Sequence, residues 1–418
     1  MKIIIANRFY FPDESATSRM VTSLARSLVR QGACVHIVAS DAHHDSPRRE
    51  PTEAVQDGVA VHRVRSTALG RHRIWRRALD YLTFHFGAAR RVRALAEPGD
   101  VVIVCTDPPL LSVSLLGALW HRDAVMVNWL HDLFPEAAIQ LGVLRRGIAA
   151  KLLVRLRNLS LRAARTSVAP MPRMAEFLAQ SGIPGDRLEV IRHWSDGREI
   201  HPVARETNAL RRDWGLEGKF VVGYSGNFGR VHEFGTILDA AERLRADPRI
   251  TFLFIGSGHR RAWFESEVSR RGLSNVIMKP LQPRDRLAES LGAADVHLIS
   301  LLPDLETCSV PSKLYGILAA GRPVLFVGDR DGEVATVVGN GGCGASVAVG
   351  DPAALAERIL ALAGDETVRR TMGDAARHLF ETDYVEAAGV ANWHRLLRRL
   401  GVTEAAAASR AEGADARV

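Results

Sequence analysis

Short apolar runs rich in β-branched residues alternate with segments of helical periodicity from the start of the chain. In the first half such runs predict buried strands at 2–6, 34–39, 59–64, 101–106 and 125–129. Strands that alternate with helices are typical of a parallel sheet covered by helices on both faces. The first half therefore predicts a doubly wound α/β domain.

A second series of the same kind begins near residue 220. Its predicted strands are 220–224, 251–255, 276–278, 296–299 and 323–327, and its predicted helices are 233–246, 260–271, 284–292 and 312–320. Further helical patterns follow at 352–363, 366–380 and 385–399. The second half therefore predicts another doubly wound α/β domain with additional helices at its end.

These patterns divide the chain into four predicted parts. The domains are expected at 1–195 and 196–384, with their boundary in the polar stretch 193–208. A last helix at 385–400 follows, and the tail 401–418 lacks a periodic apolar face, so we expect it to be disordered. Because ligands of open α/β sheets bind beyond the carboxyl ends of the strands, we expect the site in a cleft between the two domains.

The composition fits a globular protein and excludes several classes. The 418 residues are 47% hydrophobic and 24% charged, which rules out a disordered chain and a collagen-like fibre. Four cysteines lie far apart without a CxxC pair, which argues against a zinc site or disulfide framework and for a reducing compartment. The longest apolar stretch, 101–120, is interrupted by Asp107, Pro108 and Pro109, so no membrane span is expected and the protein is predicted to stay in the cytoplasm.

The positive charge is concentrated in the first half. Residues 1–200 carry 28 Lys and Arg against 19 Asp and Glu, whereas residues 201–418 carry 27 against 28. Two stretches, 63–93 and 143–165, hold nine and seven basic residues interleaved with apolar ones. Basic helices with apolar faces suit an anionic membrane surface, which predicts a peripheral membrane protein. A solvated face or nucleic-acid binding gives the same pattern, but no nucleic-acid recognition module is present, so no nucleic acid is expected as a partner.

Two polar segments follow predicted strands of the first domain. The loop 7–18 lacks a GxGxxG fingerprint and is read either as a wall of the cleft or as a surface loop with Thr17 or Ser18 as the helix N-cap. The segment 127–136 brings His131 together with Asp132 and Glu136, without the HxH or HExxH spacing of a metal site.

Three segments of the second domain carry candidate phosphate-binding chemistry. The turn 223–230 is glycine-rich and ends in Arg230, which can fork onto two phosphate oxygens. In 254–261 the third glycine of a dinucleotide fingerprint is replaced by Arg261, which argues against NAD. In 305–316 Pro311 is expected in the first helical turn, and Lys313, one of only five lysines, lies at a helix N-terminus that attracts anions. The DxD string at 329–331 is read as a surface turn.

At these residues the chain resembles a GT-B glycosyltransferase of retaining family 4, in the subgroup of WbuB-like and colanic-acid transferases that builds bacterial surface polysaccharides. The similarity spans about residues 1–400 and is carried by seven motifs in order. They are FYFPDESATSRM at 9–20, TDPPLL at 106–111, HDLFPEAAIQLGVL at 131–144, IRHWSD at 191–196, YSGNFGR at 224–230, FIGSGHR at 254–260 and VPSKLYGILAAGRPV at 310–324.

The resemblance implies two Rossmann-like domains across a cleft, a last helix that returns to the first domain, and catalysis without metal or cofactor. By position, His131, Arg230, Lys313 and Glu306 are the catalytic candidates: His131 beside the anomeric carbon, Arg230 and Lys313 on the diphosphate, and Glu306 on donor hydroxyls. The implied donor site is Gly226, Asn227, Arg230, Gly256, Leu281, Glu306, Ser309, Val310, Ser312 and Lys313. The implied acceptor side is Arg8, Tyr10, Ser15, Thr17 and Asp132.

The chain departs from the family pattern at four positions. Cys308 and Gly316 stand where many members carry two Glu residues, and Asn227 and Glu233 align with the Arg and Lys of the common phosphate loop. We expect a retaining transferase that moves a sugar from a nucleotide donor, most simply a UDP-sugar, to a lipid-linked saccharide. The alternatives are a UDP-N-acetylglucosamine 2-epimerase of the same fold, and a nucleotide-sugar-binding protein that has lost catalysis.

Overall fold

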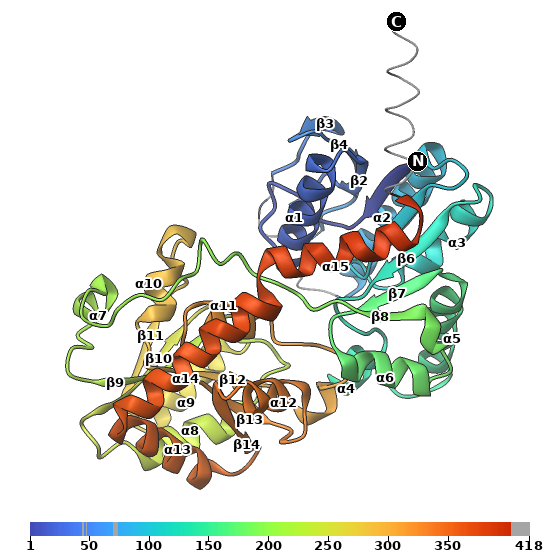
Figure 1. The fold of residues 1–418 in the computed structure, drawn as a ribbon. Coiled ribbons are helices and arrows are strands. Elements are labelled where there is room, and N and C mark those ends of the chain that lie inside the picture. Colours follow the sequence, from blue (N-terminus) through green and yellow to red (C-terminus); the bar gives the residue numbers. More distant parts are fainter. Residues whose placement is uncertain (44–45, 47, 70–73, 403–418) are drawn as a thin grey trace, which may run out of the picture. The chain divides into compact units, whose positions relative to one another are not determined.

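The computed structural model describes residues 1–43, 46, 48–69 and 74–402, so nearly all of the predicted tail at 401–418 lies outside the described residues. The described chain forms two compact units (Figure 1). Unit 1 is Met1–Arg192 together with the residues from Gly389 onward, and unit 2 is His193–Ala388. The change of unit at residue 193 lies three residues before the start of the predicted second domain.

Unit 1 contains an eight-stranded sheet in the order β3-β4-β2-β1-β5-β6-β7-β8. Its strands are β1 (Lys2–Ala6), β2 (Cys34–Ser40), β3 (Glu53–Gln56), β4 (Val59–Val64), β5 (Val101–Cys105), β6 (Val125–Trp129), β7 (Thr166–Ala169) and β8 (Leu188–Val190). All neighbours pair in parallel except the edge strand β3, which pairs antiparallel with β4. The sequence analysis predicted the parallel strands β1, β2, β4, β5 and β6 and did not predict the edge strand β3. β3 is antiparallel because a two-residue turn joins it to β4, and such a turn is too short for a parallel crossover.

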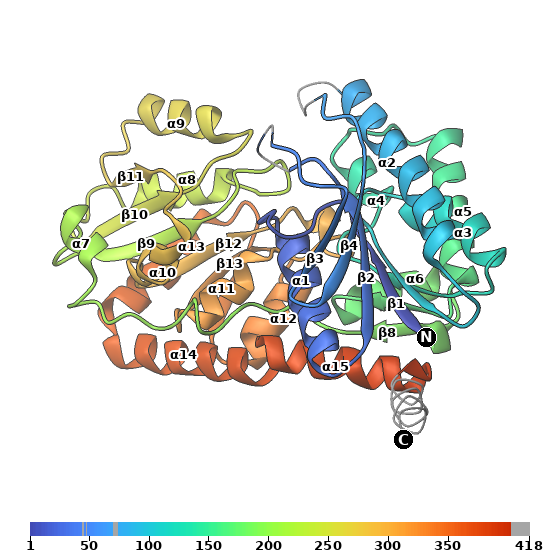
Figure 2. The same ribbon diagram turned by 90° about the horizontal axis from the view of Figure 1, so that it is seen from above.

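Helices cover both faces of this sheet. They are α1 (Ala16–Arg30), α2 (Ile74–Leu95), α3 (Leu111–Trp120), α4 (Glu136–Gln140), α5 (Ile148–Ala163) and α6 (Pro172–Gln180). Figure 2 shows α2, α3 and α5 on the same side of this sheet, where α3 packs against both α2 and α5. Phe84, Ala88 and Val92 of α2 are fully buried in a core shared with Val102 and Val104 of β5, which fixes the position of α2 on the sheet.

The last helix, α15 (Glu386–Arg399), begins within unit 2 and packs on unit 1 from Gly389 onward. The ring of Trp393 lies 4.7 Å from that of Trp129, and His394 Nε2 lies 3.3 Å from Ser27 Oγ on α1. Trp393 is fully buried by these contacts. The C-terminal helix is thus a component of the unit 1 core.

Unit 2 contains a six-stranded, wholly parallel sheet in the order β11-β10-β9-β12-β13-β14. Its strands are β9 (Phe220–Ser225), β10 (Ile250–Ile255), β11 (Val276–Lys279), β12 (Val296–Ser300), β13 (Val324–Gly328) and β14 (Gly344–Ala348). Its α-helices are α7 (Ala209–Asp213), α8 (Gly235–Arg243), α9 (Arg261–Arg270), α10 (Leu287–Gly292), α11 (Lys313–Ala319), α12 (Glu333–Asn340), α13 (Pro352–Gly364) and α14 (Glu366–Leu379). Both units are therefore doubly wound α/β domains, which confirms the predicted fold class.

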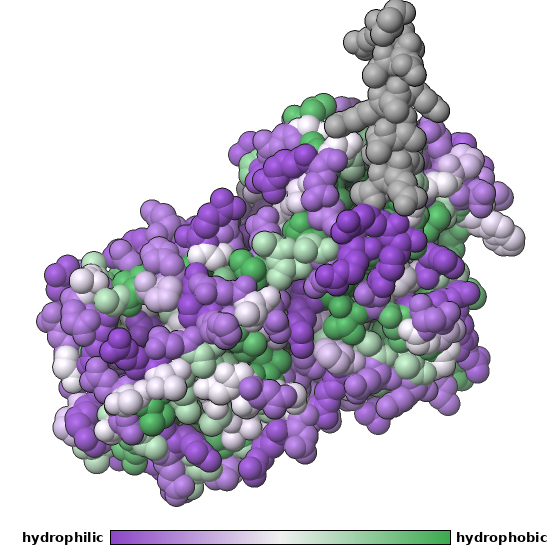
Figure 3. Space-filling view, in the orientation of Figure 1, coloured by the Kyte–Doolittle hydropathy of each residue, from purple (hydrophilic) through white to green (hydrophobic). Residues whose placement is uncertain are grey.

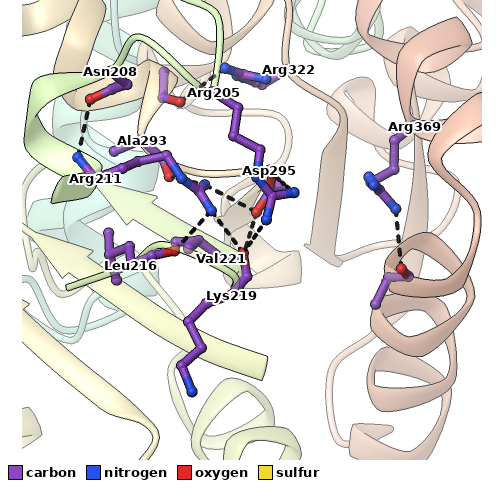
Figure 4. Close-up of polar contacts among 12 residues, drawn as sticks. Arg205, Asn208, Arg211, Leu216, Lys219, Val221, Ala293, Asp295, Arg322 and Arg369 are labelled. Carbon is purple, nitrogen blue, oxygen red and sulfur yellow. Dashed lines mark hydrogen bonds and ion pairs between the residues drawn. The ribbon is translucent and has the colours of Figure 1, made fainter. Parts of the chain in front are cut away.

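A buried ionic cluster closes the amino-terminal edge of the unit 2 sheet (Figure 4). Asp295, directly before β12, accepts a 2.7 Å hydrogen bond from the Val221 N–H and forms ion pairs with Arg211 at 3.2 Å and Arg205 at 3.4 Å. Arg211 also donates to the carbonyls of Leu216, Lys219 and Ala293. This cluster anchors the segment 205–219 to the sheet and leaves ligand binding to the opposite, carboxyl edge.

Candidate functional site

Two glycine turns interlock beyond the carboxyl ends of β9 and β10. The Gly226 N–H donates to the Ile255 carbonyl at 2.9 Å, and the Phe228 N–H donates to the Ser257 carbonyl at 2.8 Å. A Cβ on Gly256, whose φ is +153°, would lie 1.9 Å from the Gly226 carbonyl oxygen. Only glycine fits at position 256, because the two turns approach each other through their backbones.

Arg261 explains why the second turn is not a dinucleotide fingerprint. Its guanidinium donates to the backbone carbonyls of Gly256 and, at 3.1 Å, of Lys279 at the end of β11. The position that a third glycine occupies in a dinucleotide site is therefore taken by a side chain that ties the turn to the neighbouring strand.

Lys313 is the first residue of α11 and lies against the first glycine turn. Its Nζ is 3.7 Å from the centroid of the Tyr224 ring and 3.4 Å from His232 Nε2. A Cβ built on Gly226 would lie 3.6 Å from the same Nζ. Burial lowers the pKa of the Lys313 ammonium well below its ordinary value, and no carboxylate among the described residues offsets that effect. The Lys313 amine at this site therefore lacks a counter-anion within this part of the chain.

His232 is the residue of this site that the sequence analysis missed. Its Nδ1 lies 2.6 Å from the Ser300 carbonyl oxygen at the end of β12, so Nδ1 carries the proton and Nε2 offers a lone pair toward Lys313. Burial, with a smaller contribution from the nearby Lys313 charge, lowers the pKa of His232 to about 3, so the ring is neutral near pH 7. Its place two residues after Arg230, just beyond the glycine turn, was the available signal.

Arg230 and Asn227 lie on the exposed side of the same turn. Arg230 reaches His259 near the end of the second turn, with 3.0 Å between its Nη2 and His259 Nε2. The Asn227 carbonyl accepts a 2.8 Å hydrogen bond from the Tyr224 hydroxyl. The turn thus has a rigid buried side, formed by Tyr224, and an accessible cationic side.

Glu306 lies against the start of α12. Its carboxylate is buried and accepts a 3.2 Å hydrogen bond from the Glu333 N–H, the first residue of α12. A Cβ on Gly332 would lie 2.5 Å from the Glu306 carboxyl carbon, so the backbone packs directly on this group. Glu306 therefore stabilises the start of α12, and its contact with donor hydroxyls stays a prediction.

The rest of the segment 305–316 differs from expectation in one detail. Helix α11 begins at Lys313 with Ser312 as its N-cap residue, so Pro311 precedes the helix instead of lying in its first turn. Ser309 and Val310 are half-buried, Ser312 is exposed, and Leu281 beyond β11 is 57% exposed. These four side chains remain accessible to a ligand.

The two positions that lack the family Glu residues are apolar here. Cys308 is buried. A Cβ on Gly316 would meet the Leu291 and Ile200 side chains at 3.5 and 3.6 Å, which are ordinary van der Waals distances. A methyl group fits at Gly316.

His131 follows β6 at the carboxyl edge of the unit 1 sheet. Its N–H donates to Thr106 Oγ1 at 3.0 Å, its ring lies 5.1 Å from that of Trp129, and the residue is buried. Asp132 beside it is exposed. The half-buried Glu136 forms an ion pair at 2.6 Å with the buried Arg157, so this carboxylate is engaged structurally.

The loop after β1 gives its candidate residues separate environments. Arg8 lies 4.9 Å from the Phe9 ring and 5.0 Å from the Tyr81 ring, with Asp80 at 4.0 Å. Tyr10 is buried, and burial raises the pKa of its hydroxyl to about 12.

The start of α1 differs from the expected capping. The N-cap residue of the helix is Ser15, so the expectation of Thr17 or Ser18 at that position was wrong. The Asp13 carboxylate and carbonyl fix this start, because they accept from the Ser15 N–H and the Ser18 hydroxyl. Thr17 is half-buried in the first turn.

Two further features concern metals and membranes. Asp329 Oδ1 accepts a 3.1 Å hydrogen bond from the Asp331 N–H, so the DxD string forms a turn. No group of three or more His, Cys, Asp or Glu side chains suited to a metal ion occurs in the part of the chain that the structure describes. Among residues 1–43, 46, 48–69 and 74–402, no helix is both long and apolar enough to span a membrane.

Comparison with known proteins covers both units. The family description "Glycosyl transferase 4-like domain" matches residues 15–194, and "Glycosyl transferases group 1" matches residues 206–379. The probable glycosyltransferase WbjE of Pseudomonas aeruginosa is 30% identical over 322 residues, which are 76% of this chain and 78% of that protein. The putative colanic acid biosynthesis glycosyl transferase WcaI of Escherichia coli (strain K12) is 31% identical over 157 residues, 37% of this chain and 38% of that protein.

The solved structures extend the likeness to the three-dimensional fold. Anabaena Alr3699/HepE in complex with UDP has a TM-score of 0.73 to this chain at 14% identity, covering 96% of this chain and 100% of that one. At this identity the likeness establishes the fold alone.

Proposed function

Because this chain belongs to the glycosyl transferases group 1 family and is a glycosyltransferase, we propose that it is a retaining, metal-independent enzyme of surface-polysaccharide synthesis. Its donor is a UDP-sugar and its acceptor is a lipid-linked saccharide at the cytoplasmic face of the cell membrane. The observation that carries the donor side is the Lys313 ammonium, a cation without a counter-anion among the described residues, beside the Gly226 turn.

The chemistry needs a site that stabilises a leaving diphosphate. When the bond between the sugar C1 and the phosphate oxygen breaks, negative charge develops on the diphosphate, and preorganised cations lower the barrier to that step. Lys313 supplies one such cation, and Arg230 on the exposed side of the turn supplies a second. The incoming acceptor hydroxyl attacks C1 from the face of the leaving group and gives its proton to the departing phosphate oxygen. This sequence retains the anomeric configuration and requires no separate base.

The choice of UDP and of a polysaccharide product draws on the comparisons. HepE, which shares the fold, binds UDP, and WcaI is described as acting in colanic acid biosynthesis. The carboxyl edge of the unit 1 sheet supplies the acceptor side in this proposal. His131 lies there, with exposed Asp132 next to it. We assign His131 to the sugar beside C1 and Arg8, Tyr10, Ser15, Thr17 and Asp132 to the acceptor.

The surface of unit 1 supports the assignment of a membrane-bound acceptor. The face drawn in Figure 3 is mostly hydrophilic. The exposures of single residues show that α2 also carries a stripe of large apolar side chains at helical spacing. The stripe consists of Trp75 (52% exposed), Leu79 (41%), Leu82 (64%) and Phe86 (74%). On α5, Ile148 is 88% exposed and Leu152 54%. Such side chains beside arginines insert into an anionic bilayer surface, which provides both the apolar and the electrostatic attraction.

Helices α2 and α5, which carry the exposed apolar residues, begin at the same edge of the sheet as the candidate acceptor site. In a parallel sheet the connecting helices run opposite to the strands, so α2 and α5 begin at the carboxyl edge of the sheet. His131 lies at that same edge. A lipid-linked saccharide whose lipid stays in the bilayer therefore presents its sugar toward the edge that holds His131.

The test is turnover with a defined donor and acceptor. We expect the chain to release UDP from a UDP-sugar only when a polyprenyl-diphosphate saccharide is present, and the new linkage to keep the donor's anomeric configuration by NMR. An inverted product contradicts the retaining mechanism. Formation of the 2-epimer of the donor sugar without acceptor supports the epimerase alternative. UDP binding without any turnover supports a protein that has lost catalysis.

A further inference from the structure

We infer that His232 is a positioning residue of the donor site, which holds the Lys313 ammonium beside the Gly226 turn by presenting a fixed, neutral Nε2 lone pair to it. This inference rests on the proposed function, in which Lys313 binds the diphosphate.

The backbone carbonyl of Ser300 fixes the orientation of the His232 ring. The Ser300 carbonyl lies 2.6 Å from His232 Nδ1 and can only accept, so the proton resides on Nδ1 and the other nitrogen is an acceptor. That acceptor, Nε2, is 3.4 Å from Lys313 Nζ, which can only donate when charged. One ring therefore joins the end of β12 to the first residue of α11 through two hydrogen bonds of defined direction.

The surroundings keep the ring in place and uncharged. The His232 ring meets the Tyr224 and Phe234 rings at steep angles of 81° and 64°, with centroids 5.9 and 6.1 Å away. The His232 backbone carbonyl accepts a 2.9 Å hydrogen bond from Arg260, which adds a positive charge nearby. The aromatic surroundings and the positive charges of Arg260 and Lys313 both oppose protonation of the His232 ring. Nε2 therefore remains a hydrogen-bond acceptor, and the ring does not repel Lys313.

Lys313 depends on this contact because its other neighbours do not fix a hydrogen bond. The Tyr224 ring attracts the ammonium through its face at 3.7 Å, but this attraction has little directional preference. The Tyr224 hydroxyl is occupied, since it donates to the Asn227 carbonyl. The His232 lone pair is thus the directional contact that aims the ammonium along the turn.

Two substitutions separate the two halves of the imidazole. His232→Asn places an amide near the position of Nδ1, so it keeps a donor for Ser300 and loses the acceptor for Lys313. His232→Gln places its amide oxygen near the position of Nε2, so it keeps the acceptor for Lys313 and loses the donor for Ser300. A positioning role predicts UDP affinity about 3- to 10-fold weaker in the Asn variant and close to wild type in the Gln variant. A purely structural role predicts the opposite order.

A double-mutant cycle then tests whether His232 acts through Lys313. In a Lys313→Met background we expect His232→Asn to cause no further loss of UDP affinity, measured by calorimetry on the full chain. His297→Asn is the matched control, because His297 is also buried in unit 2 and bonded to a carbonyl, that of Leu291 at 2.8 Å. It should lower stability and leave UDP affinity unchanged.

The outcomes are distinguishable. Loss of affinity in Lys313→Met together with unchanged affinity in His232→Asn overturns this inference and leaves the donor site intact. Unchanged affinity in Lys313→Met overturns both. A nitrogen-15 NMR spectrum of the wild-type protein gives a test that needs no variant: a proton on Nδ1 and no titration of His232 between pH 5 and 8 are expected, and a proton on Nε2 contradicts the inference.

Discussion

Replacing Lys313 by methionine should make the empty protein more stable and its binding of UDP weaker. Methionine has a similar length without the charge, so Lys313→Met removes the ammonium and keeps most of the packing. In the structure Lys313 is half-buried, no carboxylate among the described residues pairs with it, and desolvation lowers the pKa of its ammonium well below the ordinary value. The folded protein therefore bears a cost for the charge that the variant does not.

The size of the effect follows from opposing contributions. Taking an ammonium out of water costs several kcal/mol. The contact with the Tyr224 ring at 3.7 Å returns about 0.5–2 kcal/mol, and the His232 hydrogen bond returns about 0.5–1.5 kcal/mol. We expect a net gain of about 1–3 kcal/mol in the free energy of unfolding, which raises Tm by about 2–4 °C per kcal/mol for a unit of this size. Loss of a charge-assisted phosphate contact should weaken UDP binding by about 1.5–3 kcal/mol, or roughly 10- to 150-fold.

The difference in stability between Lys313→Met and the wild type should depend on pH in a defined direction. A lysine whose pKa is lowered on folding destabilises the protein fully below its folded pKa, and the cost disappears as pH rises toward the unfolded value of 10.5. The advantage of Lys313→Met should therefore shrink as the pH rises toward 10.5. Thermal denaturation of both proteins from about pH 6 to about pH 10, with and without UDP, is the assay. A variant that is less stable at neutral pH and binds UDP normally refutes the reasoning.

Further predictions concern single features of each unit. Gly256→Ala should unfold or strongly destabilise unit 2, by at least about 3 kcal/mol, because its Cβ meets the Gly226 carbonyl. Gly316→Ala should stabilise unit 2 by about 0.4–1 kcal/mol, since a methyl fits in that helix, and a lowered Tm of this variant contradicts the reasoning. The pKa values of His232 and His297 are about 3 and about 4, below the ordinary 6.5. The free energy of unfolding should therefore fall as the pH drops from 6.5 toward 4. A Tm that does not change with pH in this range counts against buried neutral rings. His131→Ala should lower turnover with little change in UDP affinity, and full turnover removes its assigned role. The wild-type chain should sediment with phosphatidylglycerol vesicles at low salt and be released at high salt. Replacing the exposed Leu82 and Phe86 by Ser should weaken this co-sedimentation. Equal co-sedimentation of both proteins contradicts the role of the α2 stripe.

The sequence predicted the sheets well because their strands are buried runs with a simple pattern. β1, β4 and β6 have the predicted bounds. Four strands were missed, and their local signals are weaker: β3 is a polar edge strand, β7 and β8 have only four and three residues, and β14 is an edge strand of mostly small residues. Their positions depend on pairing with a neighbour, which a local pattern does not encode.

The sequence predicted those parts of the candidate site that a short sequence motif encodes. The glycine turn at 226 and the lysine at 313 stand out in the sequence, and the structure brings them together. The part played by His232 was not visible, because its two partners, Ser300 and Lys313, are 68 and 81 residues away. The engagement of Glu306 at the start of α12 was missed for the same reason, since Glu333 lies 27 residues further on.

The central claim is that unit 2 binds a uridine diphosphate through Lys313. The most direct measurement is the Tm of the wild-type chain with UDP, GDP, TDP, CMP and NAD, each at millimolar concentration. A ligand at about 100 times its Kd adds about 2.7 kcal/mol to the stability of the protein. The account predicts a rise in Tm with UDP and not with NAD. A rise with NAD alone, or no rise with any nucleoside diphosphate, contradicts it.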